Sequence, residues 1–349
     1  MRAYGVTYDT GFLSAGTTTH EPFDPDTVRR EMQIIRDELY GDAVRVTGGD
    51  PDRLETAAHH AARAGLEVWY SPFTNGLTQD ELLTFIVDSA ERAERLRQDG
   101  TRVVFLTGSE ISLVTSGFLP GDSLKERIGL MAEPARLRAV LPELPTRVNT
   151  FLTRAVAAVR ERFGGPISYA SLPFEGVDWA PFDMIATDAG YRDATTAHGF
   201  RAGLRALTSQ GKPFAVTEFG CTTHRGAAAL GGRGDSIIEW DERARPRLAA
   251  TVVRDEEEQA VYVRELLEIY DEEGMDTAFI NTFARRDLPT SSEPERDFDT
   301  ASFGIVKILE HGRTGTTYPG LPWEPKAAFH TLAEYGRARR AEIERRTMT

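Results

Sequence analysis

The sequence predicts an α/β protein: one (β/α)8 TIM barrel formed by residues 1–349, with long loops on its catalytic face. Three observations favour this fold. Strand-like apolar segments and helix-like amphipathic segments alternate from end to end, as in parallel α/β proteins. The strand-like segments number eight, as a closed barrel requires, and a doubly wound sheet stays open as the alternative although no glycine-rich phosphate loop follows the first strand. Finally, no linker of different composition divides the chain, and residues 337–349 are expected to be a charged helix end or tail.

The expected elements follow one another in a regular order. The strands are Ala3–Tyr8, Ala43–Val46, Glu67–Tyr70, Arg102–Leu106, Ile167–Ala170, Met184–Thr187, Phe214–Thr217 and Thr277–Asn281. Asp24-Pro25 has the N-cap and first residue typical of a helix start. Thr78 and Glu81 have the spacing of a capping box. The last helix is expected to begin near Trp323–Lys326 and to close the ring.

Three long irregular stretches each follow an expected strand. They are Ile111–Asp122, Cys221–Arg254 and Phe283–Phe303. In a barrel they would lie on the catalytic face, where long loops usually carry function. The second stretch contains four glycines, so it can bend closely around a ligand or move as a lid.

Composition and charge exclude several classes of function. The net charge of −13 repels nucleic acid and anionic membranes, and it does not discourage neutral substrates such as sugars. The single cysteine, Cys221, excludes an internal disulfide and a cysteine-rich metal site. Nucleotide-binding, zinc-protease and serine-hydrolase motifs are absent from the sequence, so we expect no cofactor and no metal. Without an apolar leader or a membrane-length apolar run, the expected location is cytoplasmic, and the oligomeric state stays open.

Two of the expected strands lead into a glutamate beside a small residue. Glu110 follows Thr107-Gly108-Ser109, and Glu218 lies between Thr217 and Phe219-Gly220. Barrel active sites lie at the carboxyl ends of the strands, so both side chains would face the same mouth. Two such carboxylates can act as acid and nucleophile on a glycosidic bond. Arg45 lies inside an apolar strand, where an arginine is expected only if it pairs with a carboxylate.

The segment Thr217–Gly220 resembles the nucleophile strand of clan A glycoside hydrolases. In that clan the acid/base glutamate ends the fourth strand and the nucleophile ends the seventh, which are the places of Glu110 and Glu218. The resemblance implies a retaining mechanism with these two residues in those roles. It also implies that Arg45 keeps the nucleophile ionised while Glu110 keeps its proton, and that either Tyr191 or Asp188 orients the nucleophile.

The chain departs from the clan pattern at two points. Ser109 stands where the clan usually has an asparagine that contacts the sugar 2-hydroxyl, and it can offer one shorter hydrogen bond. Strand eight contains Asn281 and lacks the tryptophan that the clan often places beneath the sugar. The candidate substrate-binding residues, which are polar or aromatic and lie at or after strand ends, are Tyr8, Asp9, Trp69, Trp179, Trp240 and Asn281.

Longer stretches are similar to the actinobacterial "abortive infection protein" group of clan-A-like barrels. They are Gly108–Ser112, Phe118–Gly121, Pro173–Trp179, Thr217–Cys221 and Asp299–Lys307. This resemblance implies a (β/α)8 barrel with a glycosidase-like carboxylate pair, and it supplies no substrate.

Three hypotheses of function remain open. The first is a retaining glycoside hydrolase that acts on a small glycoside. The second is a biosynthetic enzyme that uses the same carboxylates for acid/base or cation-stabilising chemistry on a non-carbohydrate small molecule. The third is a non-catalytic ligand-binding or defence-associated barrel. A polar cleft with exposed tryptophans would favour the first, an apolar pocket the second, and a blocked or displaced glutamate pair the third.

Overall fold

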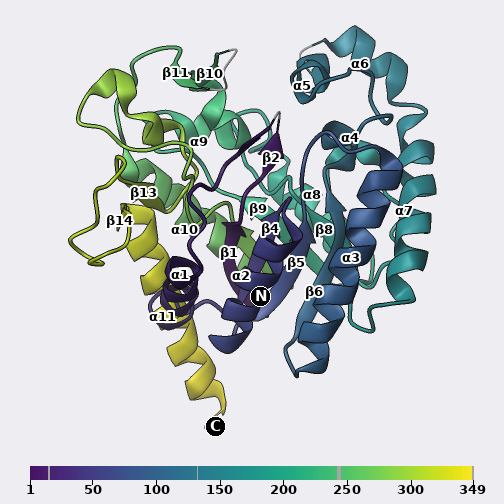
Figure 1. Ribbon diagram of the computed structural model, residues 1–349, viewed down its shortest axis with the longest axis horizontal. Helices are drawn as coiled ribbons and strands as arrows, with labels where there is room; N and C mark the ends of the chain where they lie inside the picture. The colour runs from purple at the N-terminus through teal and green to yellow at the C-terminus, as the bar shows by residue number, and fades with distance from the viewer. Residues whose placement is uncertain (15, 132, 242–244, 348–349) are drawn as a thin grey trace.

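The computed structural model describes residues 1–14, 16–131, 133–241 and 245–347. Among these residues, eight parallel strands close into a barrel, which confirms the predicted fold class (Figure 1). The barrel strands are β1 (Ala3–Asp9), β4 (Ala43–Gly48), β5 (Glu67–Pro72), β6 (Val103–Ser109), β7 (Ile167–Ser171), β8 (Ile185–Thr187), β9 (Phe214–Phe219) and β12 (Thr277–Ile280). Strand β1 closes the ring by pairing with both β4 and β12.

Helices surround the barrel, and their predicted start signals are confirmed (Figure 1). The longer helices are α1 (Pro25–Asp37), α2 (Pro51–Arg63), α3 (Gln79–Gln98), α7 (Leu144–Arg160), α8 (Phe200–Thr208), α10 (Glu256–Glu272) and α11 (Ala327–Thr347). The Asp24 side chain accepts from the backbone amides of Asp26 and Thr27 at the start of α1. Thr78 and Glu81 form the reciprocal capping box of α3.

Two expectations about the helices were wrong. Trp323–Pro325 forms strand β14, which pairs with β13 (Val306–Ile308), and the last helix begins at Ala327. A proline disfavours helical geometry in the residue before it, so Glu324 stays extended, and the pairing of Pro325 with Val306 keeps Pro325 in the strand. Residues 172–184, all of which the structure describes, contain the 3-10 turn η1 (Pro173–Glu175) and no α-helix between β7 and β8.

The apolar core has two parts, because successive strand residues face opposite sides of the sheet. The larger part fills the space between strands and helices. The smaller part consists of strand residues on the other face, inside the barrel, and includes Trp69, Leu106, Met184 and Phe279. The rings of Trp69 and Phe279 meet edge to face with centroids 5.1 Å apart. These apolar side chains fill the interior of the barrel between its two ends.

Loops and short elements gather at the carboxyl ends of the strands (Figure 1). The short helices are α4 (Ile111–Val114), α5 (Leu124–Met131), α6 (Pro134–Val140) and α9 (Ala227–Leu230). The 3-10 turns are η2 (Gly231–Ile237), η3 (Pro294–Arg296) and η4 (Phe298–Ala301). Two hairpins are formed by β2 (Leu13–Ser14) with β3 (Thr17–Thr18), and by β10 (Ile238–Trp240) with β11 (Pro246–Leu248). The stretches predicted to be long loops therefore follow β6, β9 and β12.

A buried ion cluster ties these loops to the last helix. Lys326, fully buried before α11, pairs with Asp299 at 2.8 Å and donates to the Thr223 hydroxyl at 2.7 Å. Arg254 reaches the same Asp299 at 2.9 Å and also Asp297 at 2.7 Å. The segments after β9 and after β12 are thus held in one fixed arrangement.

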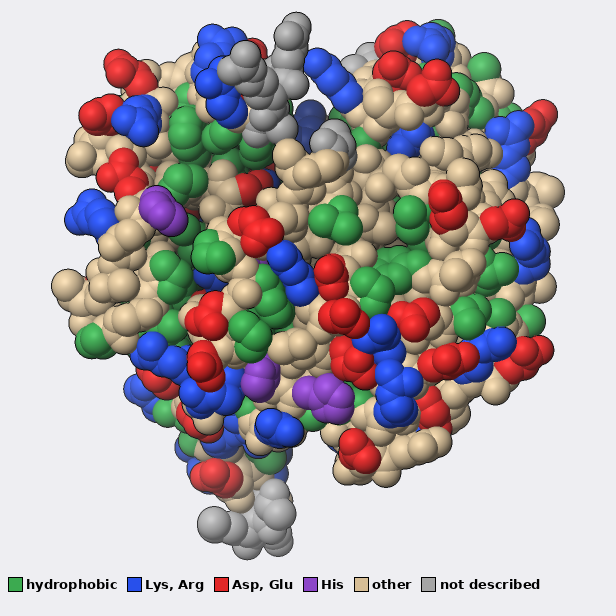
Figure 2. Space-filling model, in the orientation of Figure 1, with side chains coloured by type: hydrophobic (Ala, Val, Ile, Leu, Met, Phe, Trp, Pro, Cys, Tyr) green, Lys and Arg blue, Asp and Glu red, His purple; other side chains and the backbone are tan. Residues whose placement is uncertain are grey.

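The outer surface carries charges of both signs side by side (Figure 2). Arg92 of α3, for example, pairs with Asp52 and Glu55 of α2 and with Asp88 of its own helix. Residues 337–347, expected to be a helix end or tail, belong to helix α11. In the described part of the chain, no helix is both long and apolar enough to cross a lipid bilayer.

Candidate active site

Arg45 is the centre of the polar network at the barrel mouth. It points inward from β4, and its side chain is completely buried. Its guanidinium donates to Asp188 at 2.7 Å, to Glu218 at 3.0 Å, to the Ser109 hydroxyl at 3.1 Å and to the Ser71 hydroxyl at 3.2 Å. The predicted pairing of Arg45 with a carboxylate is therefore present, and two carboxylates share the one guanidinium.

Glu218 is held by donors from three different parts of the barrel. Arg45 of β4 binds Oε1, while the Tyr191 hydroxyl and the Asn281 amide donate to Oε2 at 3.1 and 3.0 Å. Asn281 also donates to the Tyr191 oxygen at 2.8 Å. The side chain of Glu218 remains 15% exposed, so one part of its carboxylate still faces the mouth. These donors fix the orientation of the Glu218 carboxylate at the mouth.

Glu110 lies at the end of β6 in an unusual backbone conformation. Its φ of 46° and ψ of 36° are left-handed, which is uncommon for a residue with a side chain. Its amide donates to the carbonyl of Ala170 in β7 at 3.0 Å. Burial and the negative charges of Asp188 and Glu218 raise the pKa of Glu110 well above its usual value. Glu110 is therefore suited to carry a proton at neutral pH.

The pKa of Glu218 is raised, although the resemblance implied that this carboxylate stays ionised. Burial and the neighbouring Asp188 raise the pKa of Glu218 to about 8, although Arg45 and Tyr191 oppose this rise. We predicted that Arg45 would keep Glu218 ionised; instead Arg45 shares its charge with Asp188. Among the described residues, no side chain donates a hydrogen bond to the Glu110 carboxyl as Arg45, Tyr191 and Asn281 do to Glu218, so Glu110 holds its proton more tightly.

Asp188 and Ser109 are directed into the network and not toward a ligand. The Asp188 side chain is fully buried and takes the shortest contact with Arg45. The Ser109 hydroxyl donates to Asp188 and accepts from Arg45. Ser109 therefore has no free proton to offer a sugar hydroxyl, which corrects the prediction that it could replace the missing asparagine. Of the two predicted orienting residues, Tyr191 contacts Glu218, whereas Asp188 acts on it through Arg45.

Asn281 and Asp9 occupy the mouth, but in roles other than those predicted. Asn281 binds Glu218 and Tyr191 in place of a substrate. Asp9 accepts from the Gly11 amide at 2.8 Å and from the Thr19 hydroxyl, so it holds the loop after β1. Burial raises the pKa of Asp9.

Tyr8 and Trp69, predicted to bind substrate, do not reach the mouth. Tyr8 points outward from β1 and donates to the buried Glu31 of α1. Trp69 is completely buried inside the barrel, and its indole nitrogen donates to Glu67 at 2.9 Å. Side chains alternate along a strand, and a one-residue step decides whether an aromatic ring faces the barrel or the helices.

Trp179 and Trp240 also lie outside the network around Arg45. Trp179 packs against Phe182, and its carbonyl accepts from Lys212, which precedes β9. This places Trp179 at the amino ends of the strands, opposite the mouth. Trp240 is 44% exposed on the β10–β11 hairpin and, within the described part of the chain, forms no hydrogen bond or ring contact with the network residues.

Sequence reasoning missed four charged side chains near the mouth. Glu175, in η1, is fully buried beside the loop that carries Glu110. Arg285 pairs with Asp287 at 2.8 Å after β12, and its charge acts on Asp235 and Asp9. The only sequence signal was a charged residue in an otherwise apolar or glycine-rich loop after a strand.

Among the described residues, no group of three or more histidine, cysteine or acidic side chains is arranged to hold a metal ion.

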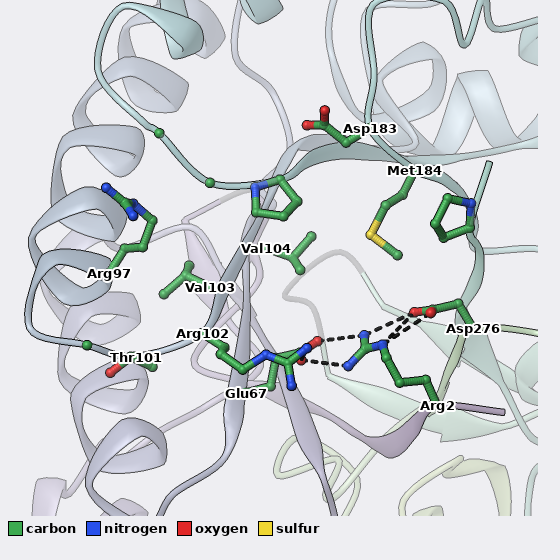
Figure 3. Close-up of a pocket in the computed structure, with 15 residues that line it drawn as sticks. Arg2, Glu67, Arg97, Thr101, Arg102, Val103, Val104, Asp183, Met184 and Asp276 are labelled. Carbon is green, nitrogen blue, oxygen red and sulfur yellow. Dashed lines mark hydrogen bonds and ion pairs between the residues drawn. The ribbon is translucent and has the colours of Figure 1, made fainter.

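A cavity of about 640 Å³ lies at the opposite end of the barrel (Figure 3). Figure 3 shows Glu67 between the guanidinium groups of Arg2 and Arg102, which it binds at 2.7 and 3.2 Å. Arg2 also binds Asp276 at 3.0 Å. These ion pairs join the amino ends of the strands, the face of a barrel that serves stability. The candidate active site is therefore the mouth around Glu110 and Glu218.

Comparisons with known proteins show the fold of this chain. No protein-family model matches the sequence, and no curated protein matches it. The solved structures that resemble it include several glycoside hydrolases at low sequence identity, and the likeness shows that this chain shares their (β/α)8 barrel fold.

The individual likenesses extend over nearly all of the chain. One is a GH113 beta-1,4-mannanase, with a TM-score of 0.61 and 15% identity over 97% of this chain and 99% of that chain. The GH113 beta-mannanase of Alicyclobacillus acidocaldarius has a TM-score of 0.60 and 16% identity over 97% and 98%. The GH2 beta-galacturonidase of Eisenbergiella tayi has a TM-score of 0.54 and 14% identity, over 97% of this chain and 51% of that one. The resemblance to the abortive infection group stays a prediction.

Proposed function

We propose that this protein is a retaining glycoside hydrolase in which Glu110 is the acid/base and Glu218 the nucleophile. The observation that carries the proposal is the environment of Glu218. Donors from β4, from the loop after β8 and from the end of β12 converge on this carboxylate at the barrel mouth. The same mouth holds Glu110, whose pKa is raised well above its usual value by burial and by nearby carboxylates.

The proposed reaction has two steps. Glu218 attacks the anomeric carbon while the Glu110 carboxyl protonates the glycosidic oxygen, so the carbon–oxygen bond breaks and an ester to Glu218 forms. Water then attacks the same carbon as Glu110 takes a proton from it, and Glu218 leaves as a carboxylate. Tyr191 and Asn281 hold the nucleophile in position during both steps. Arg45 stabilises the carboxylate that forms when the ester is hydrolysed.

The proposed substrate is a glycoside, and the structural likenesses suggest where to begin. The mannanases and the galacturonidase are named for β-linked sugars, one neutral and one acidic. We expect a panel of aryl β-mannosides, β-glucosides, β-galacturonides and β-glucuronides to include a substrate. The configuration of the first-formed sugar, followed by nuclear magnetic resonance, should match that of the substrate.

The Glu218→Gln variant tests the nucleophile. We expect turnover to fall by at least about 10³-fold, because an amide cannot form the glycosyl ester. An activated fluoroglycoside should add one glycosyl mass to the wild-type chain at Glu218, and not to the variant. Glu55→Gln, the same change on the outer helix α2, is the matched control and should keep full activity. Retention of turnover in Glu218→Gln would exclude the mechanism.

A second candidate is acid/base chemistry on a non-carbohydrate small molecule. The observation that favours it is that Ser109 and Asn281 are used within the network and not presented to a ligand. The positions where the clan A resemblance implies sugar contacts are thus occupied by internal hydrogen bonds. If no glycoside of the panel is cleaved and no glycosyl adduct forms, this candidate takes precedence.

A further inference from the structure

Three consecutive backbone amides at the end of β6 are each anchored to β7 or to the turn after it. The amide of Glu110 donates to the Ala170 carbonyl at 3.0 Å. The amide of Ile111 donates to the Tyr169 hydroxyl at 2.9 Å. The amide of Ser112 donates to Oε1 of Glu175 at 3.1 Å. The left-handed residue Glu110 is thus fixed by bonds to its own amide and to the two that follow.

Glu175 is the side chain that completes this set of anchors. It is fully buried, and the Tyr169 hydroxyl lies 2.9 Å from both of its oxygens. The Leu172 amide donates to Oε2 at 2.8 Å. Tyr169 therefore accepts from Ile111 and donates to Glu175, so one hydrogen-bonded chain links both residues to the loop that carries Glu110. A non-glycine residue in left-handed geometry is strained and persists only where its surroundings hold it, as these bonds do.

The charge of Glu175 also acts on Glu110. The groups whose charges act on Glu110 are Asp188 after β8, Glu218 in β9, Glu175 after β7 and Arg45 in β4. The first three are carboxylates that favour the protonated form of Glu110, and Arg45 opposes them. Three donors to Glu175 favour its charged form, although burial raises its pKa.

We propose that Glu175, acting with Tyr169, is a positioning residue for Glu110: it fixes the turn that aims this carboxyl and helps to keep it in the acid form. The inference rests on the proposed function, in which Glu110 protonates the leaving group. Neither Glu175 nor Tyr169 touches the substrate. Their effect is therefore expected in the step that needs the proton of Glu110.

Two variants separate the anchoring of the Glu110 turn from the effect of the Glu175 charge. Tyr169→Phe removes the anchor of the Ile111 amide and leaves the Glu175 carboxylate in place. Glu175→Gln removes the charge and turns one oxygen into a donor that faces a backbone amide. Tyr4→Phe is the matched control, because Tyr4 is an equally buried tyrosine of β1 whose hydroxyl donates to the Leu39 carbonyl away from the mouth.

The dependence on the leaving group is the decisive kinetic readout. A poor leaving group needs protonation, and a good one leaves without it. We expect kcat for an alkyl or phenyl glycoside to fall at least about tenfold in both variants, with KM nearly unchanged. For a dinitrophenyl glycoside the glycosylation rate should change by less than about twofold. Equal losses on both substrates, or no loss on either, would overturn the inference.

The pH profile then distinguishes the two variants. The alkaline limb reports loss of the proton from Glu110, so Glu175→Gln should move it to lower pH. Tyr169→Phe keeps the charge and should leave this limb in place while kcat falls. Should Glu175→Gln fail to fold, the leaving-group result of Tyr169→Phe decides the positioning role.

A measurement without substrate separates this inference from the proposed function. Carbon-13 labelling of the glutamate carboxyls, with Glu110→Gln to assign the signal, gives the titration midpoint of Glu110 directly. We expect a lower midpoint in Glu175→Gln than in the wild type, and an unchanged midpoint would overturn the inference. If no glycoside is cleaved while the midpoint still falls, the proposed function fails and the electrostatic role of Glu175 stands.

Discussion

Arg45 shows how far single residues can be interpreted from sequence. A guanidinium in an apolar strand requires a carboxylate, which predicted an ion pair for Arg45, and the resemblance to clan A implied Glu218 as its partner. It did not predict that Asp188 would make the shorter contact. Burial and the neighbouring charge of Asp188 raise the pKa of Glu218 to about 8, and Arg45 opposes this rise only in part because it also pairs with Asp188.

This sharing leads to a prediction about pH. If Glu218 must be ionised to attack, activity rises as pH increases through its pKa, so the acid limb of the wild-type profile should lie near pH 8. Asp188→Asn removes the competing charge and leaves Arg45 to Glu218 alone. The pKa of Glu218 should then fall, and the acid limb should move at least about one unit to lower pH.

The profile of kcat/KM against pH measures this shift. Asp183→Asn, the same change at the opposite end of the barrel, is the control and should leave the limb where it is. An acid limb that stays in place in Asp188→Asn would show that Asp188 does not set the charge state of Glu218.

At the scale of elements, the sequence correctly predicted features that depend only on neighbouring residues, such as the helix starts. The N-cap Asp24 and the capping box of Thr78 and Glu81 satisfy free amides within one turn, so their sequences are sufficient to place the helix starts. Segment Trp323–Pro325 was misassigned because its partner strand, Val306–Ile308, is 15 or more residues away in the chain. Pairing between distant segments leaves little trace in a local pattern.

The ion cluster that ties the loops to α11 can be tested by stability. Lys326→Met leaves the buried Asp299 with Arg254 as its remaining cation, so we expect the free energy of unfolding to fall by about 3 kcal/mol. Urea unfolding followed by circular dichroism measures the change. Lys307→Met, which breaks the partly exposed pair with Glu256, should cost less than about 1 kcal/mol. Similar losses of unfolding free energy in both variants would contradict the expectation that the buried ion pair contributes more than the partly exposed one.

At the scale of the whole molecule, barrel closure decides which aromatic side chains can meet a ligand. Trp69 and Trp240 are both tryptophans at or after strand ends, yet one fills the barrel interior and the other lies on a hairpin at the surface. Trp179 lies near the amino ends of the strands, since residues 172–184 return along the barrel without a helix. Proximity to a strand end in sequence was therefore too weak a criterion for substrate contact.

The two tryptophans provide a matched pair of variants. Trp69→Ala should lower the free energy of unfolding by about 3–5 kcal/mol, because it leaves a cavity against Phe279 and removes one hydrogen bond to the Glu67 carboxylate. Trp240→Ala should change it by less than about 0.5 kcal/mol, as expected for an exposed side chain. The midpoint of urea unfolding measures both. A mild effect of Trp69→Ala would mean that the barrel interior repacks.

The sequence by itself determined the barrel, its eight strands and the candidates Glu110, Glu218 and Arg45. These follow from local periodicity and from the cost of burying a charge without a partner, which a linear pattern reveals. Only the tertiary structure decided that Asp188 competes for Arg45, that Asn281 and Tyr191 hold Glu218, and that Glu175 and Tyr169 anchor the Glu110 turn. These contacts join residues that are distant in the chain. They exist because closing the barrel brings the carboxyl ends of all eight strands to one mouth.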